Sequence, residues 1–404
     1  MARNTLGFDA GSFKLASPSQ SLAAIKGIPG FTNGKKRSVG GGAGVPVVLS
    51  NASLWSWGQN ALGSLGLGNT TNYSSPKQVG ALTTWSKLAG GNLSSFAIKT
   101  DGTLWSWGFN TSGRLGLGNT TDYSSPKQIG ALTTWSKIAP GILSAGALAI
   151  KTDGTLWSWG GNASGQLGLG NTTDYSSPKQ VGALTTWSEV AGTNLFSVAI
   201  KTDGTLWSWG SNSVGQLGLG NLTNYSSPKQ VGALTAWSKV FATQVSGIAI
   251  KTDGTLWSWG ANNYGQLGLG NTTNYSSPKQ IGALTNWSNV AGQTAGVVST
   301  KTDGTLWSWG LNNVGQLGLG NLTNYSSPKQ VGALTTWSKL SGADHTLAIK
   351  TNGTLWSWGY NNRGQLGLGD ITVRSSPVQI GALTTWFEVA GISNGATLAI
   401  QVIP

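Results

Sequence analysis

The chain of 404 residues contains 62 Gly and 21 Trp, but only 25 Lys and Arg, 12 Asp and Glu and one His, and its formal net charge is +13. Because it has no Cys, disulfides, thiolate catalysis and Cys-based metal sites are excluded, and one His is too few for a His-rich metal centre. No stretch approaches the roughly 18 consecutive apolar residues of a membrane span, so we expect no membrane insertion.

Residues 1–44 form a Gly-rich segment with no Trp and with a single acid, Asp9, against several basic side chains. Such a segment cannot build its own core. We therefore predict an extended arm that docks on other proteins of a large assembly through aromatic anchors and basic groups. The predicted docking residues are Arg3, Phe8, Phe13, Lys14, Lys26, Phe31, Lys35, Lys36 and Arg37. Packing of the arm on its own chain is the alternative.

Residues 45–404 form a tandem repeat with a period of about 50 residues. Each unit contains Leu-Trp-Ser-Trp-Gly, and a third Trp follows some thirty residues after the first, so three Trp in each of seven units account for all 21. The first Trp of the units are Trp55, Trp105, Trp157, Trp207, Trp257, Trp307 and Trp356. We expect these indoles to form the core rather than a sugar-binding platform.

Short strands are predicted in each unit. Thr-Asp-Gly-Thr, as at residues 100–103, lies between two apolar runs and predicts a hairpin with a tight primed turn, because Asp-Gly accepts positive φ. The segment after Pro76 and the run that begins at Trp85 predict two more strands. No segment has an apolar stripe long enough for a helix. Four short strands at this period predict the blades of a β-propeller.

The repeated Trp-Gly-x-Asn-x-x-Gly-Gln-Leu-Gly-Leu-Gly, followed by Pro and by Val-Ala-Gly, resembles the repeat of the regulator of chromosome condensation family. Residues 342–349, Gly-Ala-Asp-His-Thr-Leu-Ala-Ile, are closest to that family's Gly-x-x-His-Thr-Leu-Ala. The resemblance covers residues 45–404 and implies an all-β, seven-bladed β-propeller. Since some relatives are guanine-nucleotide exchange factors and others are secreted enzyme inhibitors, it also implies a protein-binding role.

Both ends of the repeat offer a strand for the same position. Residues 45–49 align with residues 95–99 without a gap, and residues 396–401 are an eighth copy of the same strand. We expect the C-terminal strand to complete the first blade, because this closure removes an exposed sheet edge. A β-solenoid that never closes is the alternative.

Two sets of residues are candidate binding groups. A Lys follows the repeated Pro in six units, and closure would arrange these Lys as a ring that could bind an anionic surface or a host glycan, although solvated Lys at strand edges is the simpler interpretation. The candidate anion ring is Lys77, Lys127, Lys179, Lys229, Lys279 and Lys329. Larger side chains also vary in the Trp-Gly-x-Asn-x-x-Gly loops, where recognition is common. The candidate recognition residues are Phe109, Tyr264, Leu311, Tyr360 and Arg363.

Catalysis is not expected. His345 beside Asp344 is the single possible dyad, and a structural His is the simpler interpretation. We predict no catalytic residue, no metal and no cofactor. Nucleic-acid binding is also not expected, because the aromatic side chains it needs beside basic residues are assigned to the core.

The arm and the nearly identical units together favour a structural or adhesive role. The leading hypothesis is a phage virion component, of the head-decoration or tail-fibre type, anchored by the arm and located in the virion. The alternative is a protein-binding propeller, such as an exchange factor or a secreted enzyme inhibitor, that is secreted or located at the cell surface.

Overall fold

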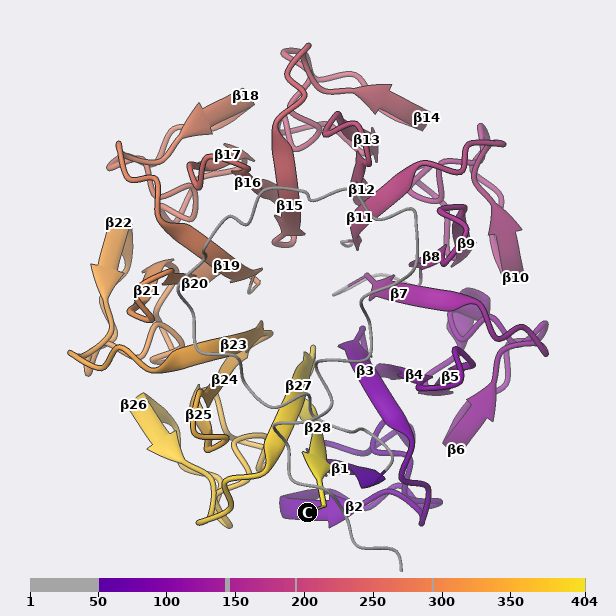
Figure 1. Ribbon diagram of the computed structural model, residues 1–404, viewed down its shortest axis with the longest axis vertical. Coiled ribbons are helices and arrows are strands. Elements are labelled where there is room, and N and C mark those ends of the chain that lie inside the picture. Colours follow the sequence, from indigo (N-terminus) through magenta and orange to yellow (C-terminus); the bar gives the residue numbers. More distant parts are fainter. Residues whose placement is uncertain (1–50, 142–145, 193–194, 293, 404) are drawn as a thin grey trace, which may run out of the picture. The chain divides into compact units, whose positions relative to one another are not determined.

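Each repeat unit folds into four short antiparallel strands whose bounds follow the repeated motifs. The computed structural model describes residues 51–141, 146–192, 195–292 and 294–403, all within one unit of the chain, residues 48–404. The predicted arm, with all its docking residues, and residues 45–49 lie outside the described residues. The strands form seven sheets of four, which Figure 1 shows arranged as a ring, so the predicted seven-bladed propeller is confirmed.

The innermost strand of each blade begins at the third Trp of the unit (Figure 1). These strands are β3 (Trp85–Gly90), β7 (Trp135–Pro140), β11 (Trp187–Gly192), β15 (Trp237–Ala242), β19 (Trp287–Gly292), β23 (Trp337–Gly342) and β27 (Trp386–Ile392). The second strand of each blade is almost fully buried, since both of its faces pack against neighbouring blades. These strands are β4 (Ser94–Lys99), β8 (Gly146–Lys151), β12 (Phe196–Lys201), β16 (Ser246–Lys251), β20 (Gly296–Lys301), β24 (His345–Lys350) and β28 (Ala396–Val402).

The third strand of each blade carries Leu-Trp-Ser-Trp-Gly. These strands are β1 (Ala52–Gly58), β5 (Leu104–Gly108), β9 (Leu156–Gly160), β13 (Leu206–Gly210), β17 (Leu256–Gly260), β21 (Leu306–Gly310) and β25 (Leu355–Gly359). The fourth strand contains the repeated Pro, which a sheet tolerates at an edge because no ladder N–H is needed there. These strands are β2 (Tyr73–Gln78), β6 (Tyr123–Gln128), β10 (Tyr175–Gln180), β14 (Tyr225–Gln230), β18 (Tyr275–Gln280), β22 (Tyr325–Gln330) and β26 (Arg374–Gln379).

The ring closes as predicted. Blade 1 has the strand order β2-β1-β28-β27, so its two inner strands come from the C-terminal part of the chain and its two outer strands from the beginning of the repeat. Strand β28 pairs with β1 from Ala52↔Val402 to Gly58↔Ala396. Blades 2 to 7 follow in chain order, from β3–β6 to β23–β26. A short 3-10 turn, η2 (Thr111–Gly113), lies in blade 2.

The hairpin between the second and third strands forms, but its turn differs from the primed turn that was predicted. In blade 2, Gly102 N–H donates to Lys99 O at 3.0 Å, and Gly102 has a φ of +77° whereas Asp101 does not have positive φ. This is a type I turn closed by a left-handed Gly. Asp101 Oδ1 accepts hydrogen bonds from the N–H and the hydroxyl of Thr103. Asp101 therefore stabilises the turn through its side chain and not through a positive φ of its backbone.

The second and third Trp of each unit lie in the core, as predicted, whereas the first Trp is only partly buried. The second Trp of every unit is fully buried, and its indole N–H crosses to the preceding blade; Trp159 Nε1 donates to Arg114 O at 2.9 Å. The Gly-rich motif makes room for it, because a Cβ at Gly116 would lie 2.8 Å from Trp159 Nε1. The third Trp packs edge to face against the other two, with Trp135 6.2 Å from Trp157 and 6.1 Å from Trp159.

The register of the strands defines two faces of the propeller. The turn face carries the Thr-Asp-Gly-Thr hairpins and the Gly-Ala-Leu-Thr-Thr linkers between blades, which meet where Thr100 N–H donates to Thr84 O. The loop face carries the connections from the first to the second strand and from the third to the fourth, because Gly108 pairs with both Ser94 and Tyr123.

Candidate functional site

The candidate recognition residues all lie on the loop face, in the loops that follow the third strands of their blades. The structure brings Leu311 of blade 6 and Tyr360 of blade 7 together at one cavity. Tyr264 lies in blade 5 and is 45% exposed. Phe109 lies apart, in blade 2, where its ring contacts the guanidinium of Arg114.

The cavity between blades 6 and 7 has a volume of about 340 Å³. Its lining residues are Thr294, Leu311, Asn313, Val314, Gln316, Ala343, Asp344 and Tyr360. Most of the wall is apolar, and the carboxylate of Asp344 supplies its formal charge. A cavity of this size lies at the small end of the usual range for binding pockets, about 300–1,000 Å³.

Hydrogen bonds hold the polar groups of this cavity in place. The Thr294 hydroxyl donates to Asp344 Oδ1 at 2.6 Å, and Asn394 N–H donates to Oδ2 at 3.2 Å. The Asn362 amide donates to the Tyr360 hydroxyl. Arg363 is exposed in the same loop and, among the described residues, forms no ion pair with Asp344. The polar groups of the cavity are therefore held in place by the chain itself, and the cavity can accept a side chain with an apolar body and a polar end.

His345 and Asp344 do not form a dyad. His345 is fully buried, and its Nε2 donates to Thr397 Oγ1 at 2.8 Å, because the Thr397 hydroxyl itself donates to Gln365 O. Burial lowers the pKa of His345 to about 4, although the nearby Asp344 carboxylate opposes that shift. The ring is therefore neutral at physiological pH and has a structural role.

Phe109 shows how these loops can hold a guanidinium. Arg114 stands where later units have Gln, and its guanidinium carbon lies 4.4 Å from the centroid of the Phe109 ring. It also donates to Asn92 O at 2.9 Å. Desolvation by burial lowers the pKa of Arg114 to about 10, while Asp122 opposes the shift.

The candidate anion ring lies on the fourth strands, at the outer edge of the propeller. Each of these Lys stands over the Tyr that begins its own strand, with Nζ 5.3 to 5.6 Å from the ring centroid. The structure therefore spreads the six Lys one to a blade and does not bring them together. Anion binding by this set stays a prediction.

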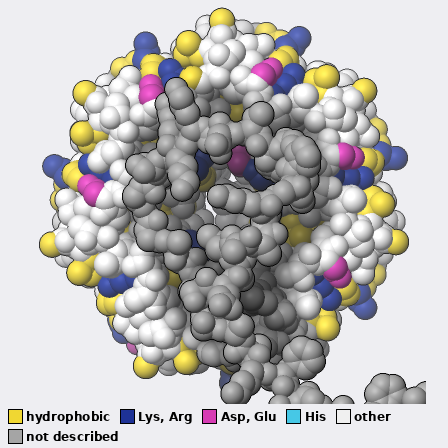
Figure 2. Space-filling view, viewed as in Figure 1, with side chains coloured by type: hydrophobic (Ala, Val, Ile, Leu, Met, Phe, Trp, Pro, Cys, Tyr) yellow, Lys and Arg dark blue, Asp and Glu magenta, His cyan; other side chains and the backbone are white. Residues whose placement is uncertain are grey.

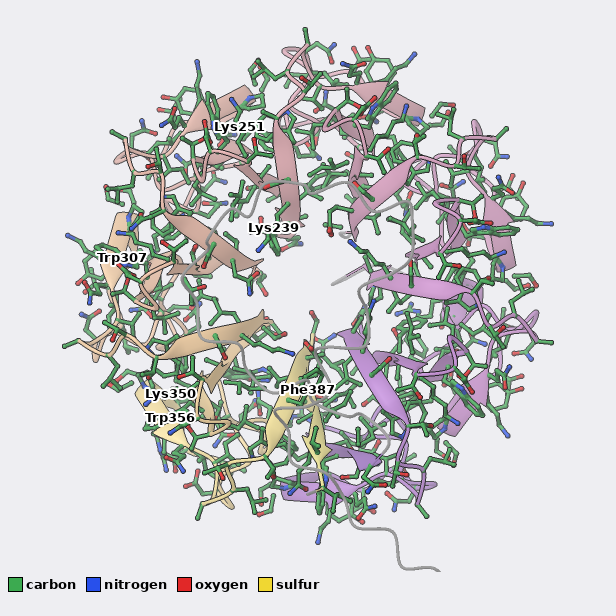
Figure 3. All side chains as sticks on the ribbon, in the orientation of Figure 1. Lys239, Lys251, Trp307, Lys350, Trp356 and Phe387 are labelled. Carbon is green, nitrogen blue, oxygen red and sulfur yellow. The ribbon has the colours of Figure 1, made fainter. Side chains whose placement is uncertain are left out.

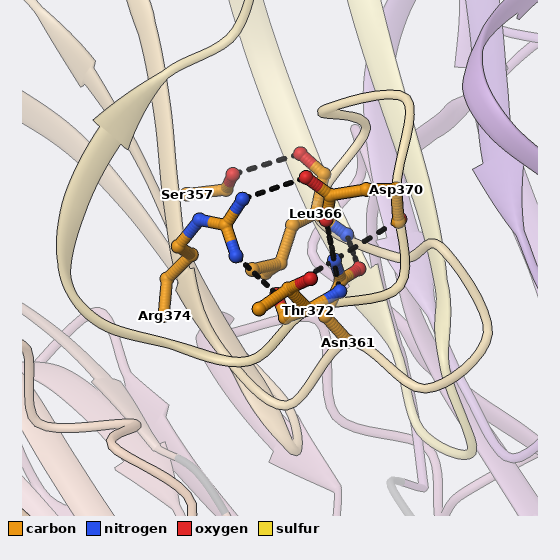
Figure 4. Close-up of polar contacts among 6 residues, drawn as sticks. All are labelled: Ser357, Asn361, Leu366, Asp370, Thr372 and Arg374. Carbon is orange, nitrogen blue, oxygen red and sulfur yellow. Dashed lines mark hydrogen bonds and ion pairs between the residues drawn. The ribbon is translucent and has the colours of Figure 1, made fainter.

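Blade 7 departs from this pattern for an electrostatic reason (Figure 4). Arg374 replaces the Tyr, and it forms an ion pair with Asp370 at 2.6 Å where blade 2 has a hydrogen bond from Asn119 to Tyr123 at 3.2 Å. A Lys at position 378 would stand over a guanidinium instead of an aromatic ring, and Val378 avoids that repulsion.

A second set of Lys is buried between indoles. At the end of β8, Lys151 Nζ lies 3.6 Å from the ring centroid of Trp157 and 5.0 Å from that of Trp135. Desolvation by burial lowers the pKa of Lys151. Figure 3 labels the equivalent pair, Lys350 and Trp356, in blade 7. These cations cap the core and are not available to a partner.

A ring of charged residues around the axis was missed by the sequence analysis. It occupies the second position after the third Trp of each unit: Lys87, Lys137, Glu189, Lys239, Asn289, Lys339 and Glu388. Lys137 pairs with Glu189, and Lys339 pairs with Glu388 at 2.8 Å. Lys239, which Figure 3 shows beside the central opening, donates to Ser288 O of the next blade.

Three members of the ring, Glu189, Lys239 and Asn289, line an axial cavity of about 460 Å³ between the inner strands. Ser341 adds a hydroxyl, and small residues form much of the remaining wall. The signal was present in the sequence, since this position changes charge from unit to unit within an otherwise repeated strand. The ion pairs and hydrogen bonds of these side chains run from one inner strand to that of the next blade, so we assign the ring a structural role.

The turn face carries seven exposed Leu, one in each linker between blades. Their exposed fractions lie between 47 and 50%: Leu82, Leu132, Leu184, Leu234, Leu284, Leu334 and Leu383. Figure 2 shows hydrophobic side chains recurring around the outer part of the ring. Similar clefts of 370, 370 and 380 Å³ lie beside Leu334, Leu284 and Leu184.

Within the described part of the chain, no group of three acids or His lies close enough to hold a metal ion. The same residues include no helix that is long and apolar enough to cross a membrane.

Comparisons with known proteins agree with this architecture. Residues 143–400 match the family model of the RCC1-like domain, and residues 51–98 and 101–142 match that of the regulator of chromosome condensation (RCC1) repeat. No curated protein matches the sequence.

Several solved structures have the same fold. Prp20p from Saccharomyces cerevisiae is 19% identical, with a TM-score of 0.78 over 89% of this chain and 93% of its own. Human WBSCR16 is 22% identical, with a TM-score of 0.77 over 87% of this chain and 98% of its own. Yeast RCC1 (Prp20) bound to Kap60 is 18% identical, with a TM-score of 0.78 over 92% of this chain and 97% of its own.

Proposed function

The chain belongs to the RCC1-like domain family, and from this premise we propose that it is a non-catalytic, protein-binding propeller that recognises its partner through the loop face. The observation that carries the proposal is the preformed cavity where Leu311 and Tyr360 meet. Aromatic side chains that line a desolvated pocket are typical centres of protein interfaces.

The structural relatives support a protein partner. Prp20p binds Gsp1p and histones, and yeast RCC1 (Prp20) binds Kap60. The loop face of this chain has the asymmetry that such recognition needs, since Tyr264, Leu311 and Tyr360 occupy loops of three successive blades. In the axial ring, four of the charged side chains form ion pairs, Lys137 with Glu189 and Lys339 with Glu388, and Lys239 donates to a backbone carbonyl.

The more specific prediction of a phage virion component stays a prediction. It rests on residues 1–44, which lie outside the described residues. The described loop face and the structural relatives support the broader protein-binding role instead.

A capture experiment tests the role of the loop face. The full chain is immobilised, and retained proteins from a lysate of its source organism are identified by mass spectrometry. The double substitution Leu311→Ala with Tyr360→Ala is compared with Leu334→Ala, which truncates an equally apolar side chain on the turn face.

We expect a defined partner that the unchanged chain and Leu334→Ala both retain and that the double variant loses by at least about tenfold. Circular dichroism and thermal unfolding confirm that both variants are folded. Equal retention by the double variant would show that this cavity is not the recognition site.

A further inference from the structure

We propose that the cavity between Leu311 and Tyr360 receives a single arginine side chain of the partner protein, with Asp344 as its counter-ion. This inference rests on the proposed function and deepens it, because it names the chemistry of the group that is bound.

The carboxylate of Asp344 provides the charge complementarity. It lines the cavity and accepts one hydrogen bond on each oxygen, from Thr294 and from Asn394. Since an ionised carboxylate has about four acceptor positions, it can accept two more N–H groups. Among the described residues it forms no ion pair, although the chain has a net charge of +13. A cation from another molecule is the group it is suited to bind.

The apolar wall fits the rest of an arginine side chain. Leu311, Val314 and Ala343 line the cavity beside Asp344 and can contact an aliphatic stem. The Tyr360 ring lines the same cavity, and its hydroxyl is held by the Asn362 amide. A guanidinium stacks on such a ring while its N–H groups reach a carboxylate.

The chain already contains the aromatic part of this arrangement in blade 2, where the guanidinium donates to a backbone carbonyl instead of a carboxylate. Phe109 and Tyr360 occupy the same position in their units, directly after Trp-Gly. Phe109 carries the guanidinium of Arg114 over its ring at 4.4 Å. Blade 7 has Gln365 where blade 2 has Arg114, and among the described residues no cation stands over Tyr360. Blade 7 therefore presents an aromatic face of the same kind without a guanidinium from its own chain.

Arginine fits better than lysine because of the shape of its charged group. A planar guanidinium can stack on Tyr360 and donate two parallel hydrogen bonds to Asp344, whereas an ammonium group acts as a point charge.

A methyl NMR titration of the full chain, labelled at Leu and Val, tests the inference. The probes are four capped tripeptides, Ac-Gly-X-Gly-NH2, in which X is arginine, citrulline, lysine or norleucine. Citrulline keeps the shape of arginine but removes its charge. We expect the arginine peptide to shift the methyl signals of Leu311 and Val314 in a saturable way and to bind about tenfold more tightly than the citrulline peptide.

Three variants assign the effect to named groups. Asp344→Asn should abolish the preference for arginine over citrulline, and Tyr360→Leu should abolish the preference for arginine over lysine while the cavity stays apolar. Asp303→Asn, which removes an exposed carboxylate on the turn face, should change neither preference.

The inference is wrong if citrulline or norleucine binds as tightly as arginine, if the arginine peptide shifts neither methyl signal, or if Asp344→Asn keeps the full preference. Because the capture experiment above uses Leu311→Ala with Tyr360→Ala, these outcomes can occur while the partner is still lost from that double variant. In that case the protein-binding role stands and only the arginine assignment falls.

Discussion

The turn face and the loop face are built from the same seven units, yet one is uniform and the other is not. Every linker on the turn face carries an exposed Leu, and Asp101, like its counterparts in four other units, accepts the same two hydrogen bonds from Thr. On the loop face, the position after Trp-Gly is Phe in blade 2, Leu in blade 6 and Tyr in blade 7. In a ring of near copies, a single binding site must come from the positions where the copies differ.

The largest effect is expected in the core that joins the two faces. Trp159→Ala and Trp309→Ala each remove a fully buried indole that donates to the preceding blade. Each should lower the free energy of unfolding by about 3–5 kcal/mol, and the two should agree within about 1 kcal/mol because their surroundings repeat. Urea unfolding measures both. If the two variants lost very different amounts of unfolding free energy, the units would differ in the core as well, and the contrast between a uniform and a variable face would fail.

A smaller, pH-dependent effect is expected from His345, whose pKa is lowered from 6.5 to about 4. Between these values the unfolded state binds the proton and the folded state does not, so stability is lost as the pH falls from about 7 to about 4, by about 3 kcal/mol. His345→Phe, which copies Phe196 at the same position of blade 4, should remove this contribution. Urea unfolding of the unchanged chain and of His345→Phe at several pH values measures this difference. If the free energy of unfolding depended on pH in the same way in both proteins, the prediction would be wrong.

The outer edge of blade 7 should contribute less to the free energy of unfolding than the buried Trp or His345. The Arg374–Asp370 pair is partly exposed, so Arg374→Ala should lower the free energy of unfolding by no more than about 1 kcal/mol. Restoring the common pattern, with Asp370→Asn, Arg374→Tyr and Val378→Lys together, should return the stability to within about 0.5 kcal/mol. Val378→Lys alone should lower the free energy of unfolding more than the triple change does, because it places Lys beside Arg374. Thermal unfolding ranks the three, and a harmless Val378→Lys would refute the electrostatic account.

The smallest effect is expected on the turn face. Leu132→Ser changes an exposed side chain that repeats in every linker, so the free energy of unfolding should change by no more than about 0.5 kcal/mol. Partner capture should be unchanged. If Leu132→Ser instead weakens capture as much as Leu311→Ala with Tyr360→Ala does, the uniform face also takes part in binding.

Much of the fold could be predicted because it is local and repeated. The spacing of the Trp gives the period, the Thr-Asp-Gly-Thr hairpin and the segments at Pro76 and Trp85 predict four strands to a unit, and the extra copy of the second strand at the C-terminus predicts closure. The turn type was wrong because Asp-Gly fits both a primed turn and a type I turn with a left-handed Gly, and only the hydrogen bonds of Gly102 decide between them.

The candidate site could be predicted only in part. Variation in the loops drew attention to Leu311 and Tyr360, which lie in different units and meet only because blades 6 and 7 are neighbours. Asp344 was considered with His345, the residue next to it, although its carboxylate accepts from Thr294 of blade 6. The axial ring escaped for the same reason, since its pairs connect residues about 50 positions apart.

The pairing that closes the ring also has a mechanical direction. Ala52 lies opposite Val402, and the strands then run antiparallel until Gly58 meets Ala396. Tension between Ala52 and Val402 would therefore load the pairing at one end, and the residue pairs would separate one after another. Tension between Ala52 and Ala396, which lie at opposite ends of the pairing, would instead load all the residue pairs together along the strands. The closure therefore resists a force along the strands better than a force that separates them at one end.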